Sequence, residues 1–155
     1  MTADELGLLD TNTLILLPQL SDPDVLPRQP LISTITLAEL SVGPLLATDE
    51  RERAARQAHL QQAEADFDPV PFDTDAARAL GQVAASLRRA GRKTAARSYD
   101  AMIAAVALAN GLPLDTCNPA DFAGIDGLTV VSVPHPEAGG SNAARAHRAA
   151  GGSWG

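Results

Sequence analysis

Short apolar runs and longer segments of helical spacing alternate along this chain. The apolar runs predict strands at 6–9, at 31–33, within 112–116 and within 128–133. Segments with helical periodicity lie between and around them, at 11–20, 36–47, 49–66, 73–91 and 98–111. Because strands alternate with helices, the pattern predicts an α/β fold whose central, mostly parallel sheet is flanked by helices.

The segment 98–111 differs from the other predicted helices because it is apolar on nearly every side. A helix without a polar face is expected to be buried in the core. Its only acidic residue, Asp100, lies in the first turn. A carboxylate at the start of a buried helix is a candidate for function.

The apolar pattern ends at Val133, and the residues beyond it are rich in glycine and alanine. A segment of that composition has no face to bury against a core. We therefore expect one folded domain over 1–134 and a flexible tail over 135–155.

Composition and charge narrow the class of protein. The 155 residues suffice for one domain with a real core, and the net charge of −7 argues against broad electrostatic binding of nucleic acid. No apolar run reaches the roughly 18 residues of a membrane span, and the N-terminus lacks the basic region of a signal peptide. One cysteine, Cys117, excludes an internal disulfide. Together these features predict a cytoplasmic protein with no membrane segment.

Acidic and amide side chains follow the predicted strands. Asp10 comes directly after the first strand, Glu39 lies in the helix after the second, and Asn118 and Asp121 follow the third. In a parallel sheet the carboxyl ends of neighbouring strands meet at one edge, where functional groups gather. We expect these groups and Asp100 to converge there.

Converging carboxylates repel one another, by roughly 4 kcal/mol for two charges about 4 Å apart at an effective dielectric constant near 20. Such a cluster must be protonated, move apart or bind a cation. Oxygen ligands without histidine or cysteine favour Mg²⁺ or Mn²⁺, which suits phosphodiester hydrolysis.

Each acid also has a purely structural interpretation. Asp10 could cap the helix that follows it, and Thr36 with Glu39 has the spacing of a capping box. Asp100 could simply favour the positive end of its helix, and Asp121 could be a surface acid. The residues alone leave both interpretations open.

Four segments, in the order "LLDTNTLI", "ITLAEL", "YDAMIAAVALANGLPL" and "TCNPADFAGIDGLTVVSV", carry a family resemblance. With these pieces the chain resembles the PIN-domain nucleases, specifically the VapC toxins of bacterial toxin–antitoxin pairs. The resemblance implies a PIN-like α/β fold and metal-dependent endonucleolytic cleavage of RNA. It also implies a small VapB-like antitoxin as partner, a homodimer, and tRNA or rRNA as the substrate.

The resemblance assigns roles by position. Asp10 and Asp100 would bind Mg²⁺ or Mn²⁺, and Glu39 and Asp121 would complete the catalytic acids. Three further side chains would support the site, namely Asn12, Thr116 and Asn118. Asp115 stands where an apolar or aromatic residue is expected. It would add a ligand if it points into the site, and would destabilise the strand if it points into the core.

Clustered arginines have two interpretations. Arg88, Arg89 and Arg97 could form a rim that contacts RNA phosphates, or they could be solvated charges at a helix end. Two other functions also stay open, namely a PIN-type RNA-processing nuclease without a toxin role, and a non-catalytic binding module whose acids are structural. A haloacid-dehalogenase-like phosphatase is disfavoured because Asn12 stands where it needs a second aspartate.

Overall fold

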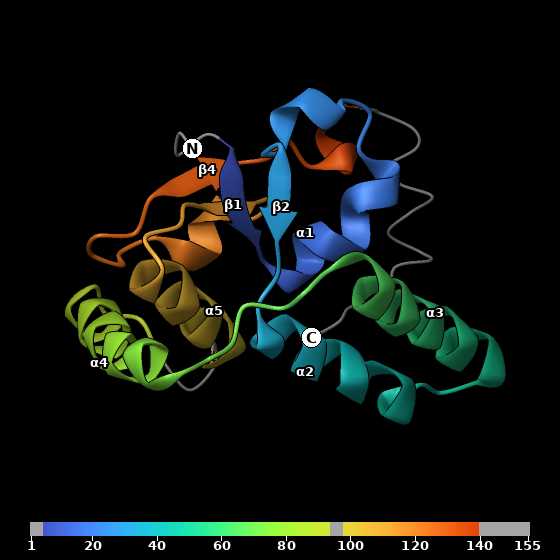
Figure 1. Ribbon diagram of the computed structural model, residues 1–155, viewed down its shortest axis with the longest axis horizontal. Coiled ribbons are helices and arrows are strands. Elements are labelled where there is room, and N and C mark those ends of the chain that lie inside the picture. The colour runs from blue at the N-terminus through green and yellow to red at the C-terminus, as the bar shows by residue number, and fades with distance from the viewer. Residues whose placement is uncertain (1–4, 94–97, 140–155) are drawn as a thin grey trace.

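The protein is described by a computed structural model that places residues 5–93 and 98–139. Its four strands form one parallel sheet in the order β2-β1-β3-β4 (Figure 1). The strands are β1 (Leu6–Leu9), β2 (Gln29–Leu31), β3 (Leu114–Thr116) and β4 (Val130–Ser132). The predicted α/β class with a parallel sheet is confirmed.

In the described part of the chain, five α-helices flank the sheet. They are α1 (Thr11–Leu16), α2 (Thr34–Val42), α3 (Glu50–Asp66), α4 (Thr74–Arg89) and α5 (Ser98–Ala109). Short 3-10 turns join them, namely η1 (Leu17–Gln19), η2 (Pro23–Val25), η3 (Gly43–Leu46), η5 (Pro119–Phe122) and η6 (Pro136–Gly139). None of these described helices is long and apolar enough to cross a membrane.

Local signals explain most helix boundaries. Asp49 and Asp73 accept hydrogen bonds from backbone N–H groups three residues ahead, so both act as the predicted N-caps. Gly91, with φ of 75°, follows α4 in the left-handed conformation that glycine adopts readily. Pro18 lies in the 3-10 turn after α1, and Pro44 in the turn after α2, because proline cannot continue an α-helix.

The second strand lies two residues earlier than predicted. It covers Gln29–Leu31, where it pairs with β1, rather than 31–33. Ser33 instead serves as the N-cap of α2, with its hydroxyl accepting from Thr36 N at 3.3 Å. Pairing with β1 and the cap at Ser33 therefore determine where this strand begins and ends, because a three-residue strand has little sequence pattern of its own.

Two apolar cores lie on opposite faces of the sheet. On one face Leu8 and Leu114 pack with α4 and α5, and α5 is buried over most of its length as predicted. On the other face Leu9 and Ile32 pack with Leu40 of α2 and side chains of α3. Figure 1 shows α4 and α5 on one side of β1 and α1, α2 and α3 on the other.

The predicted tail, 135–155, begins just before η6. Residues 140–155 lie outside the described part of the chain. The division into a domain over 1–134 and a tail therefore stays a prediction.

Candidate active site at the carboxyl edge of the sheet

Asp10 lies at the carboxyl end of β1, between the neighbouring strands β2 and β3. Its side chain is buried, with the residue 3% exposed. It also caps α1, because its Oδ1 accepts from Thr13 N at 3.3 Å. The capping interpretation is thus correct, but it does not explain why the carboxylate is withdrawn from water, which costs free energy.

Two threonine hydroxyls hold the Asp10 carboxylate. Thr13 Oγ1 donates to Oδ1, and Thr116 Oγ1 donates to Oδ2 at 3.0 Å. Burial raises the pKa of Asp10, and these hydrogen bonds lower it again in part, because they stabilise the ionised form. The predicted supporting role of Thr116 has a direct contact behind it. Thr13 was not singled out from the sequence, although threonines flanking an acid were visible there.

Glu39 is joined to Thr11, the residue that follows Asp10, by a side-chain hydrogen bond. Burial raises the pKa of Glu39, the hydrogen bond from Thr11 lowers it in part, and the charge of Asp10 adds to the rise. Thr11 Oγ1 donates to Glu39 Oε1 at 2.7 Å and lies 3.0 Å from Thr36 Oγ1. Thr11 and Thr36 are further members of the site that the sequence did not reveal.

The capping-box interpretation of Glu39 is wrong. Helix α2 begins at Thr34 with Ser33 as its cap, so Thr36 already lies inside the helix. Glu39 is one turn further on and has no helix end to satisfy. Its position beside another carboxylate favours the functional interpretation.

Asp100 and Asp121 lie on elements that pack together. Asp100 is half-buried in the first turn of α5, and Asp121 is half-buried in η5. Helix α5 contacts both α2, which carries Glu39, and η5. Asn118 N donates to Thr116 Oγ1 at 2.9 Å. This hydrogen bond connects the segment before η5 to Thr116, one of the two threonines that hold the Asp10 carboxylate. Asn12 is exposed at the second position of α1.

The donor set suits a hard cation in kind. Asp10 and Glu39 offer only carboxylate oxygens, and the charge of Asp10 disfavours the ionised form of Glu39. Among residues 5–93 and 98–139, no three Asp, Glu, His or Cys side chains lie close enough to form a complete metal cage. Mg²⁺ does not need one, since it usually takes one or two carboxylates and completes its shell with water and phosphate oxygens.

Asp115 points away from this site. Its Cα pairs with Leu9, yet its Oδ1 lies 2.3 Å from where a Cβ on Gly7 would stand, further back along β1. Only glycine leaves room for the carboxyl at that position. Oδ1 is buried with no hydrogen-bond partner among the described residues, and burial raises the pKa of Asp115 to about 6. Asp115 therefore destabilises the strand and adds no oxygen to the Asp10 site.

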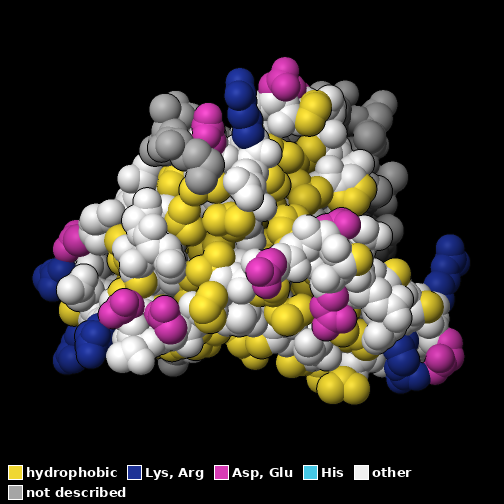
Figure 2. Space-filling model, in the orientation of Figure 1, with side chains coloured by type: hydrophobic (Ala, Val, Ile, Leu, Met, Phe, Trp, Pro, Cys, Tyr) yellow, Lys and Arg dark blue, Asp and Glu magenta, His cyan; other side chains and the backbone are white. Residues whose placement is uncertain are grey.

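The three arginines of the predicted RNA-contacting rim differ in their surroundings. Arg89 donates to Asp126 at 2.6 Å and to Ser86 Oγ at 3.4 Å, which ties the end of α4 to the loop after η5. Arg88 is exposed, and Arg97 lies outside the described residues. On the face shown in Figure 2, the basic side chains lie at the periphery, over α4, over α3 and at the top above the strands, while apolar side chains occupy the centre.

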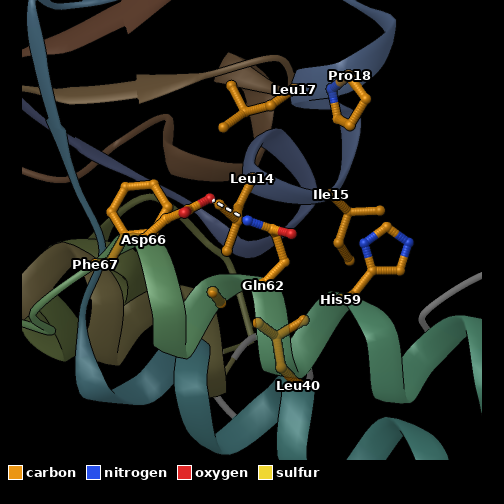
Figure 3. Close-up of a pocket in the computed structure, with 10 residues that line it drawn as sticks. Leu14, Ile15, Leu17, Pro18, Leu40, His59, Gln62, Asp66 and Phe67 are labelled. Atoms are coloured by element: carbon orange, nitrogen blue, oxygen red, sulfur yellow. Dashed lines mark hydrogen bonds between the residues drawn. The ribbon is translucent and has the colours of Figure 1, made fainter.

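An apolar pocket lies apart from the carboxylates. It is open to solvent and lies between α3 and the segment formed by α1 and η1 (Figure 3). Leu14, Ile15 and Leu17 line one side, with Gln62 and Asp66 of α3 opposite and hydrogen-bonded to each other at 2.7 Å. None of the predicted site residues lines it.

Comparison with known proteins identifies the family. Residues 8–128 match the PIN domain family. The chain belongs to that family. Within the PIN domain, Asp10 follows the first strand, and Thr116, which donates a hydrogen bond to it, ends the third.

Relatives of this PIN domain are VapC ribonucleases. Ribonuclease VapC5 of Mycobacterium tuberculosis is 37% identical over 134 residues, which cover 85% of this chain and 96% of the relative. Ribonuclease VapC1 of Rickettsia felis is 30% identical over 105 residues, covering 68% of this chain and 77% of the relative. The chain therefore belongs among the VapC-type PIN domains.

Solved structures agree with this placement. The VapBC-5 toxin–antitoxin structure from Mycobacterium tuberculosis superposes with a TM-score of 0.72 at 36% identity, covering 83% of this chain and 99% of that one. The DNA-bound VapBC structure from Salmonella typhimurium superposes with a TM-score of 0.65 at 29% identity, covering 81% and 96%. The predicted PIN-like fold and VapC resemblance are confirmed.

Proposed function

We propose that this VapC-type ribonuclease cuts RNA internally, with Mg²⁺ or Mn²⁺ bound by Asp10 and Asp100, as the toxin of a toxin–antitoxin pair. The observation that carries the proposal is the Asp10 carboxylate, which is buried, held at both oxygens and set beside Glu39. A buried acid that is oriented yet not neutralised by any described cation is arranged for function rather than for stability.

Each side chain has a distinct task in this proposal. The metal, when bound, polarises the phosphate and lowers the pKa of a bound water. Glu39 orients the attacking water: Thr11 holds its Oε1, and a raised pKa makes the carboxylate a better proton acceptor. Asp121, Asn12 and Asn118 form the rim that receives the RNA backbone.

The proposed partners follow the family. A VapB-like antitoxin would bind this chain, as the structural neighbours are toxin–antitoxin complexes. We further propose a homodimer that acts in the cytoplasm on tRNA or rRNA.

RNA cleavage by the purified protein tests the proposal. We expect cleavage with Mg²⁺ or Mn²⁺, none with EDTA, and a loss of at least about 100-fold in Asp100→Asn, since removing a ligand should exceed the cost of losing an outer partner. The rate of cleavage of a mixed RNA pool and Mn²⁺ binding by calorimetry would both be measured. Cleavage that persists in EDTA would contradict the proposed metal dependence. Absence of both cleavage and metal binding would favour a binding module.

Charge reversal at Arg88 tests the RNA rim. Arg88→Glu is expected to raise the KM for RNA several-fold and to reduce the salt dependence of binding by about one ion, because a phosphate contact is lost. Arg78→Glu is the matched control, since Arg78 is exposed on the same helix and pairs only with Asp75 among the described residues. Equal effects of the two changes would reject a specific contact at Arg88.

A further inference from the structure

Thr13 makes an unusual set of contacts for a buried threonine. It is fully buried at the third position of α1, and its hydroxyl donates to Asp10 Oδ1 while accepting from Cys117 N at 2.9 Å. In a capping box the side chain at this position reaches the backbone of the cap residue. Here it reaches the side chain of the cap residue and the loop after β3 instead, so it joins two segments about a hundred residues apart in sequence.

These hydrogen bonds suit an ionised Asp10. A backbone N–H can only donate, so the Thr13 hydroxyl accepts from Cys117 N and its single proton is left for Asp10 Oδ1. The same reasoning applies at the other oxygen, where Asn118 N donates to Thr116 Oγ1 and Thr116 donates to Oδ2. With both hydroxyl protons donated in this way, each oxygen of an ionised Asp10 accepts a hydrogen bond from a threonine hydroxyl.

The two oxygens of Asp10 are not equivalent. Oδ1 accepts two hydrogen bonds from Thr13, one from its hydroxyl and one from its backbone N–H at 3.3 Å. Oδ2 accepts one hydrogen bond, from Thr116. A carboxylate oxygen has two lone-pair directions, so Oδ1 is saturated while Oδ2 keeps one direction open.

We propose that Thr13 is a positioning residue that saturates Oδ1 of Asp10, fixes the plane of the carboxylate and leaves Oδ2 as the single oxygen presented to the metal. The inference rests on the metal-dependent function proposed above. Without the Thr13 hydroxyl, the carboxylate could rotate about its Cβ–Cγ bond and Oδ1 could compete as a ligand. Outer partners of this kind commonly change metal affinity by about 10- to 100-fold.

Mn²⁺ affinity of three variants at this position tests the assignment. Thr13→Val, which keeps the shape and removes the hydroxyl, is expected to weaken Mn²⁺ binding by about 10-fold or more and to lower kcat more than it raises KM for RNA. Thr13→Ser should restore both to within about threefold of the original protein. Thr13→Ala serves as a second hydroxyl-free variant if valine disturbs folding.

Thr34→Val is the matched control. Thr34 Oγ1 accepts from Phe72 N at 3.0 Å, the same kind of bond that Thr13 accepts from Cys117, but no carboxylate among residues 5–93 and 98–139 is hydrogen-bonded to it. This variant should lose comparable stability and keep its Mn²⁺ affinity.

The outcomes separate the inference from the function on which it rests. Unchanged Mn²⁺ affinity in a folded Thr13→Val or Thr13→Ala variant would overturn the positioning role, and so would a large loss of affinity in Thr13→Ser, which retains the hydroxyl. Failure of the unsubstituted protein to bind Mn²⁺ would instead reject the proposed metal site itself, before any variant is compared.

Discussion

Replacing Asp10 by asparagine is expected to reduce RNA cleavage by more than about 100-fold while the protein stays folded. The change keeps the shape of the side chain but removes the charge that would hold a divalent cation. It also replaces one of the two accepting oxygens by an amide nitrogen, which can donate to a threonine hydroxyl that turns to accept. The expected loss exceeds the 10- to 100-fold range typical of groups that merely support a metal ligand.

Stability should move in the opposite direction. Burial raises the pKa of Asp10, so its ionised form costs free energy in the folded state at neutral pH. Asp10→Asn removes that cost and is expected to unfold at the same or a higher temperature, as is common when a functional acid is neutralised. Cleavage rate, Mn²⁺ affinity and melting temperature would be measured together.

Asp75→Asn is the control for this experiment, because Asp75 is an exposed acid in the first turn of α4 and pairs with Arg78 of the same helix. It should leave both cleavage and metal binding unchanged. A folded Asp10→Asn protein that still cuts RNA at the original rate would show that Asp10 does not hold the catalytic metal.

Replacing Asp115 by asparagine is expected to stabilise the protein at pH 7.5 by up to about 3 kcal/mol and to change little at pH 4. The pKa of Asp115 rises from 3.8 to about 6 on folding, because burial penalises the charge and no cation among the described residues compensates it. At about 1.4 kcal/mol for each pKa unit, a rise of roughly two units corresponds to that figure.

The sign follows from proton linkage. The folded state holds a proton on Asp115 between about pH 4 and pH 6, where the unfolded state has lost it. Stability from this group is therefore greatest in acid and is lost as the pH rises through 6. Asparagine cannot ionise, so the difference in unfolding free energy between the two proteins should grow over this window and level off above pH 7.

Urea unfolding at several pH values between 4 and 8 measures this difference. The comparison isolates Asp115 even though burial also raises the pKa values of Asp10 and Glu39, since both proteins share those groups. Asp68→Asn, at an exposed loop acid, is the control. A stability difference that does not depend on pH would contradict a buried, unpartnered carboxyl at position 115.

The sequence determined the local structure and the position of the candidate site along the chain. Apolar periodicity predicted β1 and the buried helix α5, and the caps Asp49 and Asp73 marked the starts of α3 and α4 correctly. These features depend on residues within a few positions of one another, which is why a single sequence reveals them. The acids at strand ends pointed to the carboxyl edge of the sheet for the same reason.

Only the tertiary structure decided what surrounds those acids. The hydrogen bond from Cys117 to Thr13 joins residues 104 positions apart, and that from Thr116 to Asp10 joins residues 106 apart, so no local pattern predicts either. The same holds for Arg89, which could not be separated from a free phosphate-binding arginine until Asp126 was placed beside it.

Asp115 marks the boundary between the two kinds of information. Alternation along β3 puts its side chain on the face opposite Leu114, which the sequence already implies. Whether that face offers a ligand site or an apolar wall depends on what packs there. The structure places Gly7 against the carboxyl, and pairing between β1 and β3, which are distant in sequence, brought the two residues together.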